Sequence, residues 1–302
     1  MRAVVHRRYG GPEVLELVEL EKPTPADDEV LVRVRASSVN PADWYSMTGL
    51  IVARPTSGLR RPKEPRIGVD FSGVVEAVGP AVTDFAPGDE VYGGRTGALA
   101  EYVCVKNAIA KKPANLTFEE AAAVPVAAIT ALQGLRDKGA LQSGNRVLID
   151  GGSGGVGTFA VQIAKALGAS HVTAVCSTRN VEQAAALGAD RVIDYTKEDF
   201  TAIGERFDVL LDIAVTRSYR RLRRLLDPSS RLVIVGAPKS GTLLGPLGRV
   251  LKIIATSLGR KPKARFFIAK LTRDELEALN ELLEAGTVKP VVERTYPLAE
   301  IA

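Results

Sequence analysis

Apolar positions are spaced differently in the first 110 residues and in the segment that begins near residue 146. In the first segment, short runs with strand-like alternation are separated by glycine and proline, and helical periodicity is scarce. This pattern predicts a compact, mostly antiparallel β domain. The predicted strands are Arg2–His6, Val14–Leu20, Glu29–Ala36, Gly73–Val78, Glu90–Tyr92 and Ala100–Val105.

From Arg146 onward, nearly continuous apolar strands alternate with helical patterns. Such alternation predicts an α/β domain with a parallel, doubly wound sheet, whose ligands bind beyond the carboxyl ends of the strands. The predicted strands are Val147–Ile149, His171–Cys176, Arg191–Asp194, Val209–Asp212 and Leu232–Val235, with helices near 156–167, 181–187 and 218–226.

The segments between and after these regions set the expected domain boundaries. Thr117 and Glu120 form a predicted capping box before the alanine-rich segment Ala121–Lys138, which Pro125 interrupts. We expect a β domain of residues 1–122 and 287–302 and a cofactor domain of residues 123–286. Near the end we expect strand Phe266–Lys270, helix Thr272–Ala285 and strand Val288–Tyr296.

The strand Val147–Ile149 leads directly into a glycine-rich turn and then into a helical pattern. The turn is Gly152-Ser153-Gly154-Gly155-Val156-Gly157, which fits Gly-x-Gly-x-x-Gly. Gly152 would permit the tight turn, Gly154 would let the backbone approach a pyrophosphate, and Gly157 would let the helix pack close to the strand. The free N–H groups at the helix start would hold the phosphates, so the stretch predicts dinucleotide binding.

The residues after the second strand of this domain bear on which dinucleotide binds. NAD sites usually carry an acidic residue there, but this chain has Ser177, Thr178 and Arg179. Arg179 can neutralise a 2′-phosphate, which favours NADP(H) over NAD(H). In the alternative interpretation, Ser177 or Asn180 caps the following helix and Arg179 is a solvated surface residue.

Composition and charge exclude several classes of protein. The 302 residues are 46% hydrophobic and 25% charged, and no apolar run is long enough to span a membrane. The absence of an evident signal peptide leads us to expect a cytoplasmic protein, and the two cysteines indicate no disulfide framework. The net charge of +5 is modest, and an anionic cofactor accounts for part of it.

Several motifs, in the same order along the chain, resemble those of the medium-chain dehydrogenase/reductases. They are Ser38–Asp43, Gly68–Val75, Pro87–Val91, Ala98–Tyr102, Ala121–Pro125 and Thr130–Gln133, followed by the glycine loop. Within that family the chain resembles the zinc-independent quinone oxidoreductases. The resemblance implies a GroES-like β domain, a Rossmann cofactor domain and a homodimer, for which strand Phe266–Lys270 could supply the edge.

The residues argue against bound zinc. The chain has only His6, His171 and two cysteines, and the zinc-dependent relatives carry a histidine where this chain has Val69. Their four-cysteine loop is also absent, because Gly93–Ala100 holds no cysteine. We therefore expect no metal, and we interpret the neighbouring Asp70 as a structural carboxylate more readily than as a catalytic one.

The resemblance also implies which residues form the site. It places Asn40 and Tyr45 beside the nicotinamide, where their amide and hydroxyl could donate to the oxygen of the acceptor. Alternatively, Asn40 is a turn residue before Pro41, and Tyr45 belongs to the core or a pocket wall. Thr130 and the backbone near Gly236 match positions that contact the nicotinamide, and Tyr195 matches a residue that reaches the 2′-phosphate.

These inferences predict an NADPH-dependent reductase of quinones, enones or related electrophilic small molecules, with a proton supplied by water or a ribose hydroxyl. Two alternatives are an enoyl-thioester reductase, with the basic loop Arg54–Arg66 binding an anionic carrier, and a non-catalytic NADPH-binding sensor or structural protein. We interpret the basic stretches Arg217–Arg224 and Lys252–Arg265 as solvated helix faces and a basic loop near the substrate mouth, with a weak membrane or RNA contact as the alternative, and we expect no nucleic-acid partner. Relatives continue beyond the helix begun at Pro297, so we expect a trimmed chain.

Overall fold

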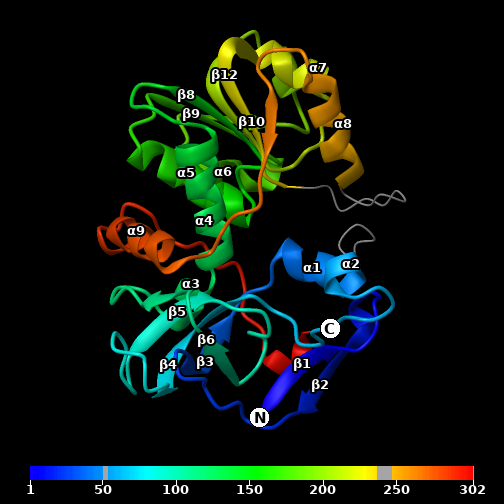
Figure 1. The fold of residues 1–302 in the computed structure, drawn as a ribbon. Coiled ribbons are helices and arrows are strands. Elements are labelled where there is room, and N and C mark those ends of the chain that lie inside the picture. The colour runs from blue at the N-terminus through cyan, green and yellow to red at the C-terminus, as the bar shows by residue number, and fades with distance from the viewer. Residues whose placement is uncertain (50–53, 237–246, 302) are drawn as a thin grey trace. The chain divides into compact units, whose positions relative to one another are not determined.

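The computed structural model describes residues 1–49, 54–236 and 247–301, and the chain divides into two compact units (Figure 1). The first unit comprises Met1–Ile129, Leu271–Glu284 and Pro290–Ala302. The second comprises Thr130–Lys270 and Ala285–Lys289. Residues 50–53, which directly precede the predicted basic loop Arg54–Arg66, lie outside the described residues.

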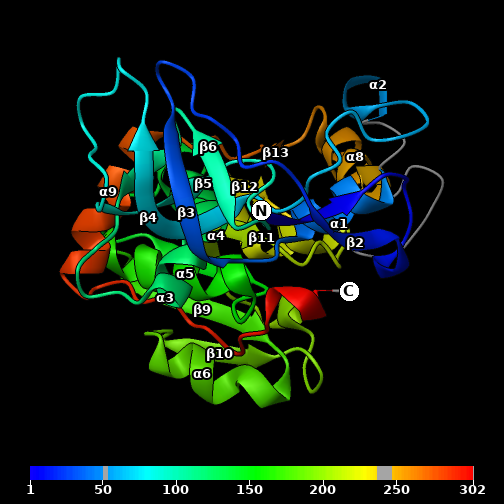
Figure 2. The ribbon, with the colours of Figure 1, turned by 90° about the horizontal axis from the view of Figure 1, so that it is seen from below.

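The first unit is built on a five-stranded antiparallel sheet with the order β6-β3-β4-β5-β7. Strands β3, β4, β5 and β6 of this sheet are labelled in Figure 2. Its core contains Val32, Phe71, Val91 and Val103. A separate antiparallel pair joins the first two strands. The strands are β1 (Arg2–His6), β2 (Leu15–Glu19), β3 (Val30–Ser37), β4 (Asp70–Val78), β5 (Glu90–Gly94), β6 (Tyr102–Val105) and β7 (Ile109–Lys111). The predicted antiparallel β domain is confirmed, although the sequence pattern missed β7.

Two short helices follow β3, namely α1 (Pro41–Thr48) and α2 (Arg54–Ser57). Helix α1 was not predicted, because eight residues are too few to show clear helical periodicity. Its local signals are nevertheless present. Pro41 occupies the first helical position, the Asn40 N–H donates to Asp43 Oδ2 (2.8 Å), and Gly49 ends the helix with φ +67°.

The second unit contains a six-stranded parallel sheet with the order β10-β9-β8-β11-β12-β13. The five predicted strands are all present, which confirms the doubly wound α/β fold. The strands are β8 (Arg146–Asp150), β9 (His171–Cys176), β10 (Arg191–Asp194), β11 (Phe207–Asp212), β12 (Leu226–Ile234) and β13 (Ala264–Phe266). The helices between them are α5 (Gly155–Ala166), α6 (Val181–Ala186), α7 (Tyr219–Leu222) and α8 (Leu247–Ser257).

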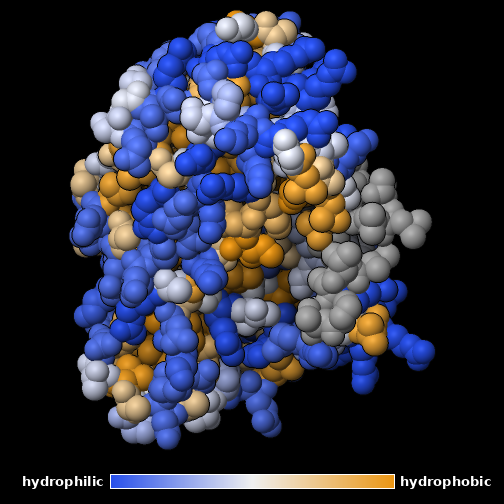
Figure 3. All heavy atoms as spheres, turned by 45° about the horizontal axis from the view of Figure 1, so that its top comes forward, coloured by the Kyte–Doolittle hydropathy of each residue, from blue (hydrophilic) through white to orange (hydrophobic). Residues whose placement is uncertain are grey.

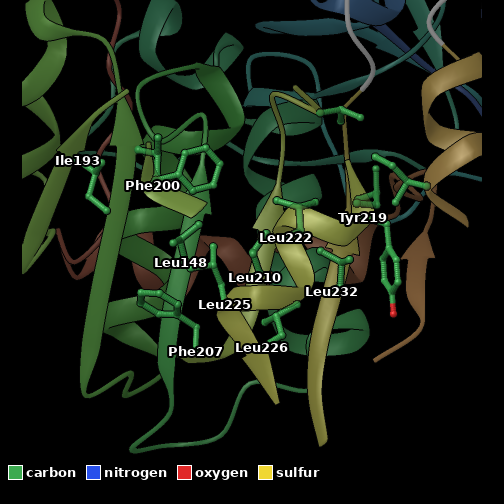
Figure 4. Packing of buried hydrophobic residues seen from close by; sticks show 14 of the residues in the cluster. Leu148, Ile193, Phe200, Phe207, Leu210, Tyr219, Leu222, Leu225, Leu226 and Leu232 are labelled. Atoms are coloured by element: carbon green, nitrogen blue, oxygen red, sulfur yellow. The ribbon is translucent and has the colours of Figure 1, made fainter. Parts of the chain in front are cut away.

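One side of this sheet is sealed by a cluster of buried side chains from the strands and from α7 and α8 (Figure 4). Leu148, Leu210 and Leu232 contribute from neighbouring strands, and Leu222 contributes from α7. Figure 4 shows Tyr219 at the edge of this cluster, with its hydroxyl directed away from the other labelled side chains. That hydroxyl donates to the carbonyl of Pro262 (2.8 Å), so the start of α7 is held to the segment before β13.

The helices α3 (Phe118–Ala122) and α4 (Pro125–Gln133) occupy the alanine-rich segment. The predicted capping box is present, because the Glu120 N–H donates to Thr117 Oγ1 and the Thr117 N–H donates to Glu120 Oε2. Pro125 stands at the start of α4, where its missing N–H costs no helical hydrogen bond. The division between the two compact units falls within α4.

The helix α9 (Arg273–Glu284) groups with the first unit, whereas the expected boundaries put it in the cofactor domain. Its contacts explain this. The Tyr92 hydroxyl of β5 is near both Leu276 O (3.0 Å) and Asn280 Oδ1 (2.7 Å), and Arg273 forms an ion pair with Asp84 (2.6 Å). These contacts bind α9 to the antiparallel sheet.

Two features near the chain end differ from the predicted ones. The predicted strand Val288–Tyr296 is wrong, because no described residue in that range belongs to a strand. Lys289 bonds instead to the Gln162 side chain through both its N–H and its carbonyl, and Pro290 has no N–H to offer. The strand predicted at Phe266–Lys270 ends at Phe266, and Lys270 bonds to the Gln133 side chain.

Candidate active site

The glycine loop joins β8 to α5, as the sequence predicts, but the roles of the individual glycines differ from the predicted roles. The left-handed residue is Gly151 (φ +94°), one position before the first glycine of the motif. At Gly152, an added Cβ would meet the Cβ of Ala174 in β9 at 2.8 Å. At Gly157, it would meet the Gly151 carbonyl oxygen at 2.1 Å, so only glycine allows the helix to start this close to the strand.

Gly154, the N-cap of α5, is the open position of the loop. A Cβ there would find no atom of the described residues closer than 3.7 Å. The N–H groups of Gly155, Val156 and Gly157 lie in the first turn of α5, where no intrahelical carbonyl precedes them. The loop therefore presents free donors and open space at a helix N-terminus, an arrangement that fits a pyrophosphate.

The end of the neighbouring strand β9 carries Ser177 and Arg179, with Tyr195 brought alongside from the end of β10. The Tyr195 N–H donates to the Cys176 carbonyl (3.1 Å), and its ring is 51% exposed. Arg179 is exposed and forms no ion pair within the described part of the chain. Neither Ser177 nor Asn180 caps a helix through its side chain. Asn180 Nδ2 instead donates to Ser153 Oγ (2.9 Å), which ties this loop to the glycine loop.

A carboxylate that sequence analysis missed lies beside this group. Asp194 ends β10 next to the end of β9, where Thr178 Oγ1 donates to its Oδ2 (2.6 Å). Thr196 adds two donors to Oδ1, its N–H (3.0 Å) and its hydroxyl (2.7 Å). These hydrogen bonds lower the pKa of Asp194. The Thr178 hydroxyl hydrogen is thus committed to Asp194 and is not offered to a phosphate.

A second missed feature lies at the centre of the sheet, where strand order reverses between β8 and β11. Asp150 and Asp212 end these two strands in register, and both side chains are buried. Their side chains hydrogen-bond to each other, and the Val215 N–H donates to Asp212 Oδ1 (2.7 Å). Burial raises the pKa of Asp150 to about 6 and that of Asp212 well above its ordinary value, so the pair retains a proton at mildly acidic pH.

This pair could have been found from the sequence. Asp150 directly follows the predicted strand Val147–Ile149, and Asp212 ends the predicted strand Val209–Asp212. Parallel strands bring their carboxyl ends to one edge of the sheet. The reversal of strand order is the position at which such sheets bind ligands. Gly236, after β12, belongs to the same edge, and a Cβ there would lie 1.9 Å from the Ile213 carbonyl oxygen. Thr130 lies in α4 and is half-buried.

In the first unit, Asp70 organises the segment that holds the predicted catalytic residues. Its buried carboxylate accepts from Asn40 Nδ2 (2.9 Å), Ser38 Oγ (2.9 Å) and the Val126 N–H (3.1 Å). Burial raises the pKa of Asp70 to about 7, while these three donors act in the opposite direction. Asp70 is therefore a structural carboxylate bonded to backbone and side chains, and no arginine among the described residues pairs with it.

Asn40 serves this network in two ways. Its amide is buried and bonded to Asp70, and its backbone begins α1, where Asp43 accepts the Asn40 N–H. Burial raises the pKa of Asp43 to about 6. Tyr45 lies one turn into α1, is partly buried, and its pKa is raised by that burial. The first unit thus contributes an amide and a phenol on one short, anchored helix.

The chain matches two family models, described as "Alcohol dehydrogenase GroES-like domain" over residues 26–114 and "Zinc-binding dehydrogenase" over residues 187–302. It is 36% identical to a 2-methylene-furan-3-one reductase of Solanum lycopersicum, over 99% of this chain and 73% of that protein. The chain belongs to the medium-chain dehydrogenase/reductase superfamily.

Further comparisons place the branch of this superfamily. The chain is 33% identical to an NADPH-dependent alkenal/one oxidoreductase of Arabidopsis thaliana, over all of this chain and 75% of that protein. It resembles the solved quinone oxidoreductase of Coxiella burnetii with a TM-score of 0.84 and 31% identity, covering 100% and 93% of the two chains. The chain thus lies in the quinone oxidoreductase/alkenal reductase-like branch, as the motifs predicted.

The name of the second family model raises the question of zinc in this member of the superfamily. Within the described ranges, no three histidine, cysteine, aspartate or glutamate side chains are grouped so that they could hold a metal ion. Residue 69 is valine, at the position where the family resemblance implies a histidine in zinc-dependent members. None of the described helices is long and apolar enough to cross a membrane.

Proposed function

We propose that this protein is a zinc-independent, NADPH-dependent reductase of quinones or of activated carbonyl and alkene compounds. The observation that carries the proposal is the glycine loop, with its open Gly154 and free N–H groups, joined through Asn180 to a strand end that carries an exposed arginine. The similarity to an NADPH-dependent alkenal/one oxidoreductase and to a quinone oxidoreductase supports the same reaction. Bound NADPH would supply a hydride for the acceptor.

The residues of the second unit would hold this cofactor by its charges. The N–H groups of Gly155, Val156 and Gly157 would bind the pyrophosphate. Arg179 would neutralise the 2′-phosphate, with Ser177 donating a hydroxyl hydrogen bond and Tyr195 covering the group from the next strand end. Thr130 and the backbone at Gly236 would contact the nicotinamide. The nearby Asp194 is ionised and accepts three hydrogen bonds from Thr178 and Thr196. The phosphate would therefore bind on the side of Arg179, away from this carboxylate.

The residues of the first unit would stabilise the negative charge that develops on the oxygen of the acceptor. We propose the hydroxyl of Tyr45 and the side-chain amide of Asn40 as the donors. Asn40 Nδ2 also donates to Ser38 Oγ at 3.4 Å, a long bond that the acceptor would replace. Asp70 would act as a positioning residue, because it holds one amide hydrogen of Asn40 and leaves the orientation of the other fixed. With no histidine assigned to the site, the proton would come from water or from a ribose hydroxyl.

The test is the loss of NADPH absorbance with benzoquinone, phenanthrenequinone, an alkenal and crotonyl-coenzyme A, with NADH run in parallel. We expect turnover of quinones or alkenals with NADPH. Arg179→Ala should raise the KM for NADPH about tenfold and leave that for NADH unchanged. Arg35→Ala removes an exposed arginine of the first unit and should change neither constant. Preference for NADH in the unaltered protein would refute the role of Arg179.

Two other outcomes separate the alternative functions. Turnover of crotonyl-coenzyme A without turnover of quinones or alkenals would identify an enoyl-thioester reductase. Tight NADPH binding by calorimetry, with no oxidation by any electrophile, would identify a binding protein that senses the cofactor. Tyr45→Phe should lower kcat with quinones about tenfold with little change in KM, because the lost donor acts on charge that develops in the transition state.

We also propose that the protein forms a cytoplasmic homodimer through β13. This strand is the edge of the parallel sheet, and such edges readily pair with a second copy. Arg265→Pro would remove an N–H from the centre of the strand and should yield a monomer in analytical ultracentrifugation. A dimer that persists in a folded variant would place the contact elsewhere.

A further inference from the structure

A groove of about 1070 Å³ lies in the second unit between the α7 segment and α8. Eight arginines and two lysines line it, against a single carboxylate, Asp227. It shares no residue with the predicted cofactor site. Figure 3 shows hydrophilic side chains spread over the upper right of the molecule, and in Figure 1 helices α7 and α8 lie on that side of the second unit.

Most of these cations are not neutralised by the protein. Arg206 pairs with Asp227 (3.1 Å), and Arg217 and Arg221 pair with Asp199 (3.8 and 3.5 Å). The other seven have no carboxylate within 4.0 Å among the residues that the structure describes. Seven like charges around one groove repel one another, and an anion bound among them would relieve that repulsion.

The groove is also held in shape by hydrogen bonds that leave donors free. Arg249 Nη1 donates to the carbonyls of Val215 (3.2 Å) and Thr216 (3.1 Å), and Arg223 Nε donates to the Lys261 carbonyl (3.1 Å). A guanidinium has five N–H donors, so each of these arginines is oriented by the backbone and keeps several donors for a ligand. The Tyr219 hydroxyl also donates to the Pro262 carbonyl, which links α7 to the segment that follows α8.

These features together select the class of ligand. A concave site of this volume suits a small molecule, and guanidinium groups bind phosphate oxygens in pairs. Seven cations call for several negative charges on that molecule. We propose that the α7–α8 groove binds a small molecule that carries several phosphate groups.

Two macromolecular ligands fit less well. Nucleic-acid strands usually stack on exposed aromatic side chains, but Tyr219, the only aromatic residue among the described lining residues, is 3% exposed. A membrane would be expected to use Leu251 and Leu258, which are 52% and 63% exposed. At helical spacing Leu251 projects from a different side of α8 than Arg249 and Thr256 of the groove, and Leu258 follows the end of the helix.

The test is calorimetry with inositol hexakisphosphate, tripolyphosphate and orthophosphate at about 0.15 M salt, where binding driven only by net charge is screened. The groove variant Arg220→Gln/Arg224→Gln/Lys252→Gln removes three exposed cations for which the structure shows no ion pair. The control Arg8→Gln/Arg35→Gln/Lys270→Gln removes three exposed cations elsewhere, with the same change of charge. We expect the polyphosphates to bind more tightly than orthophosphate, and the groove variant to bind them at least about tenfold more weakly, with the control within about twofold.

Equal losses in the two variants, or no binding of any phosphate to the unaltered protein, would overturn the proposal. Vesicles containing about 5% of a phosphatidylinositol bisphosphate distinguish a lipid headgroup from a free metabolite as the source of phosphate. Vesicle binding that free hexakisphosphate displaces would assign the lipid source to this groove, whereas vesicle binding unaffected by the groove variant would contradict it. Tighter binding of an RNA oligonucleotide, lost in the groove variant, would also contradict it. NADPH oxidation is measured on all variants, so loss of the groove is distinguishable from loss of the proposed reductase activity.

Discussion

Each unit contains a buried carboxyl site, and the two sites reduce the cost of burying a carboxylate in different ways. Asp70 in the first unit accepts three hydrogen bonds from neutral groups. Asp150 and Asp212 in the second unit face each other, and the Oδ2 atom of each has no partner among the described residues apart from the other carboxyl group. Burial raises the pKa of the carboxyl groups at both sites, but at Asp70 three donors oppose the rise, whereas in the pair the charge of Asp150 raises the pKa of Asp212 further.

The difference indicates different roles. A carboxylate surrounded by donors fixes the groups that donate to it, and here these groups include Asn40 at the start of α1 and Val126 at the start of α4. A carboxyl pair that shares a proton responds to pH and to nearby charge, and this pair lies where strand order reverses in the cofactor-binding sheet. Asp70 would thus position the site, while the pair would tune its charge.

Among these changes, we expect Asp70→Ala to lower the stability of the protein most. This change removes the acceptor of three hydrogen bonds, one of them buried and two part-buried, and a buried donor left without an acceptor costs about 1–3 kcal/mol. We expect the free energy of unfolding to fall by about 3 kcal/mol or more in urea titrations at pH 7. Turnover should fall as well, because Asn40 loses its anchor.

Asp70→Asn keeps the shape of the side chain but removes its titratable charge, so it tests the charge of Asp70 by itself. Since the folded pKa of Asp70 is about 7 and its ordinary value is 3.8, the folded state binds more protons between these values, and stability is lost as pH rises through that window. The amide variant should lose less stability than the alanine variant and should show a weaker dependence on pH between about 4 and 7. An unchanged pH dependence would contradict the assignment of this titration to Asp70.

We expect Asp150→Asn to change stability less than Asp70→Ala, and to raise it at alkaline pH instead of lowering it. Burial of the pair makes the folded state hold a proton that the unfolded chain releases, so stability declines as pH rises from about 4 through 6. An amide at this position donates a hydrogen bond to Asp212 at every pH. We expect the variant to be about 1 kcal/mol more stable than the unaltered protein at pH 8, and about equal at pH 4, in urea titrations.

The control for this change is Glu182→Gln, which removes an exposed carboxylate near the same sheet. It should leave the pH dependence of unfolding unaltered. If Asp150→Asn lowers stability at pH 8, the two aspartates do not share a proton there and the contrast with Asp70 fails.

Sequence patterns predicted the fold well because the main elements are long or strongly periodic. The strands β9 and β10 and the capping box at Thr117 were predicted residue by residue, since burial and capping are local in sequence. The glycine loop was predicted for the same reason. Helix α1 was missed because it is short, and the strand predicted at Val288–Tyr296 failed because a strand needs a partner that its own sequence does not specify.

The candidate site was predicted less completely, because its connections join residues far apart in the chain. The contacts of Asp70 with Asn40 and of Asn180 with Ser153 span 30 and 27 positions. The same holds for Asp150 with Asp212, whose proximity follows from strand order and register. Side-chain networks of this kind become visible only when the order of strands is known.

The smallest effect should come from a third carboxylate, Asp194, which extends the comparison to a site near the predicted 2′-phosphate. Thr178→Val removes one of its donors while keeping the shape of the side chain, and a donor to a charged group contributes about 1.5–3 kcal/mol at most. Because Asp194 keeps its two bonds from Thr196 and its ion pair with Lys197 (3.4 Å), we expect only a small loss of stability in urea titrations. The pKa of Asp194, followed by NMR, should rise. If the affinity for NADPH falls while that for NADH does not, the Thr178 hydroxyl holds Asp194 away from the phosphate; equal affinities would make this contact purely structural.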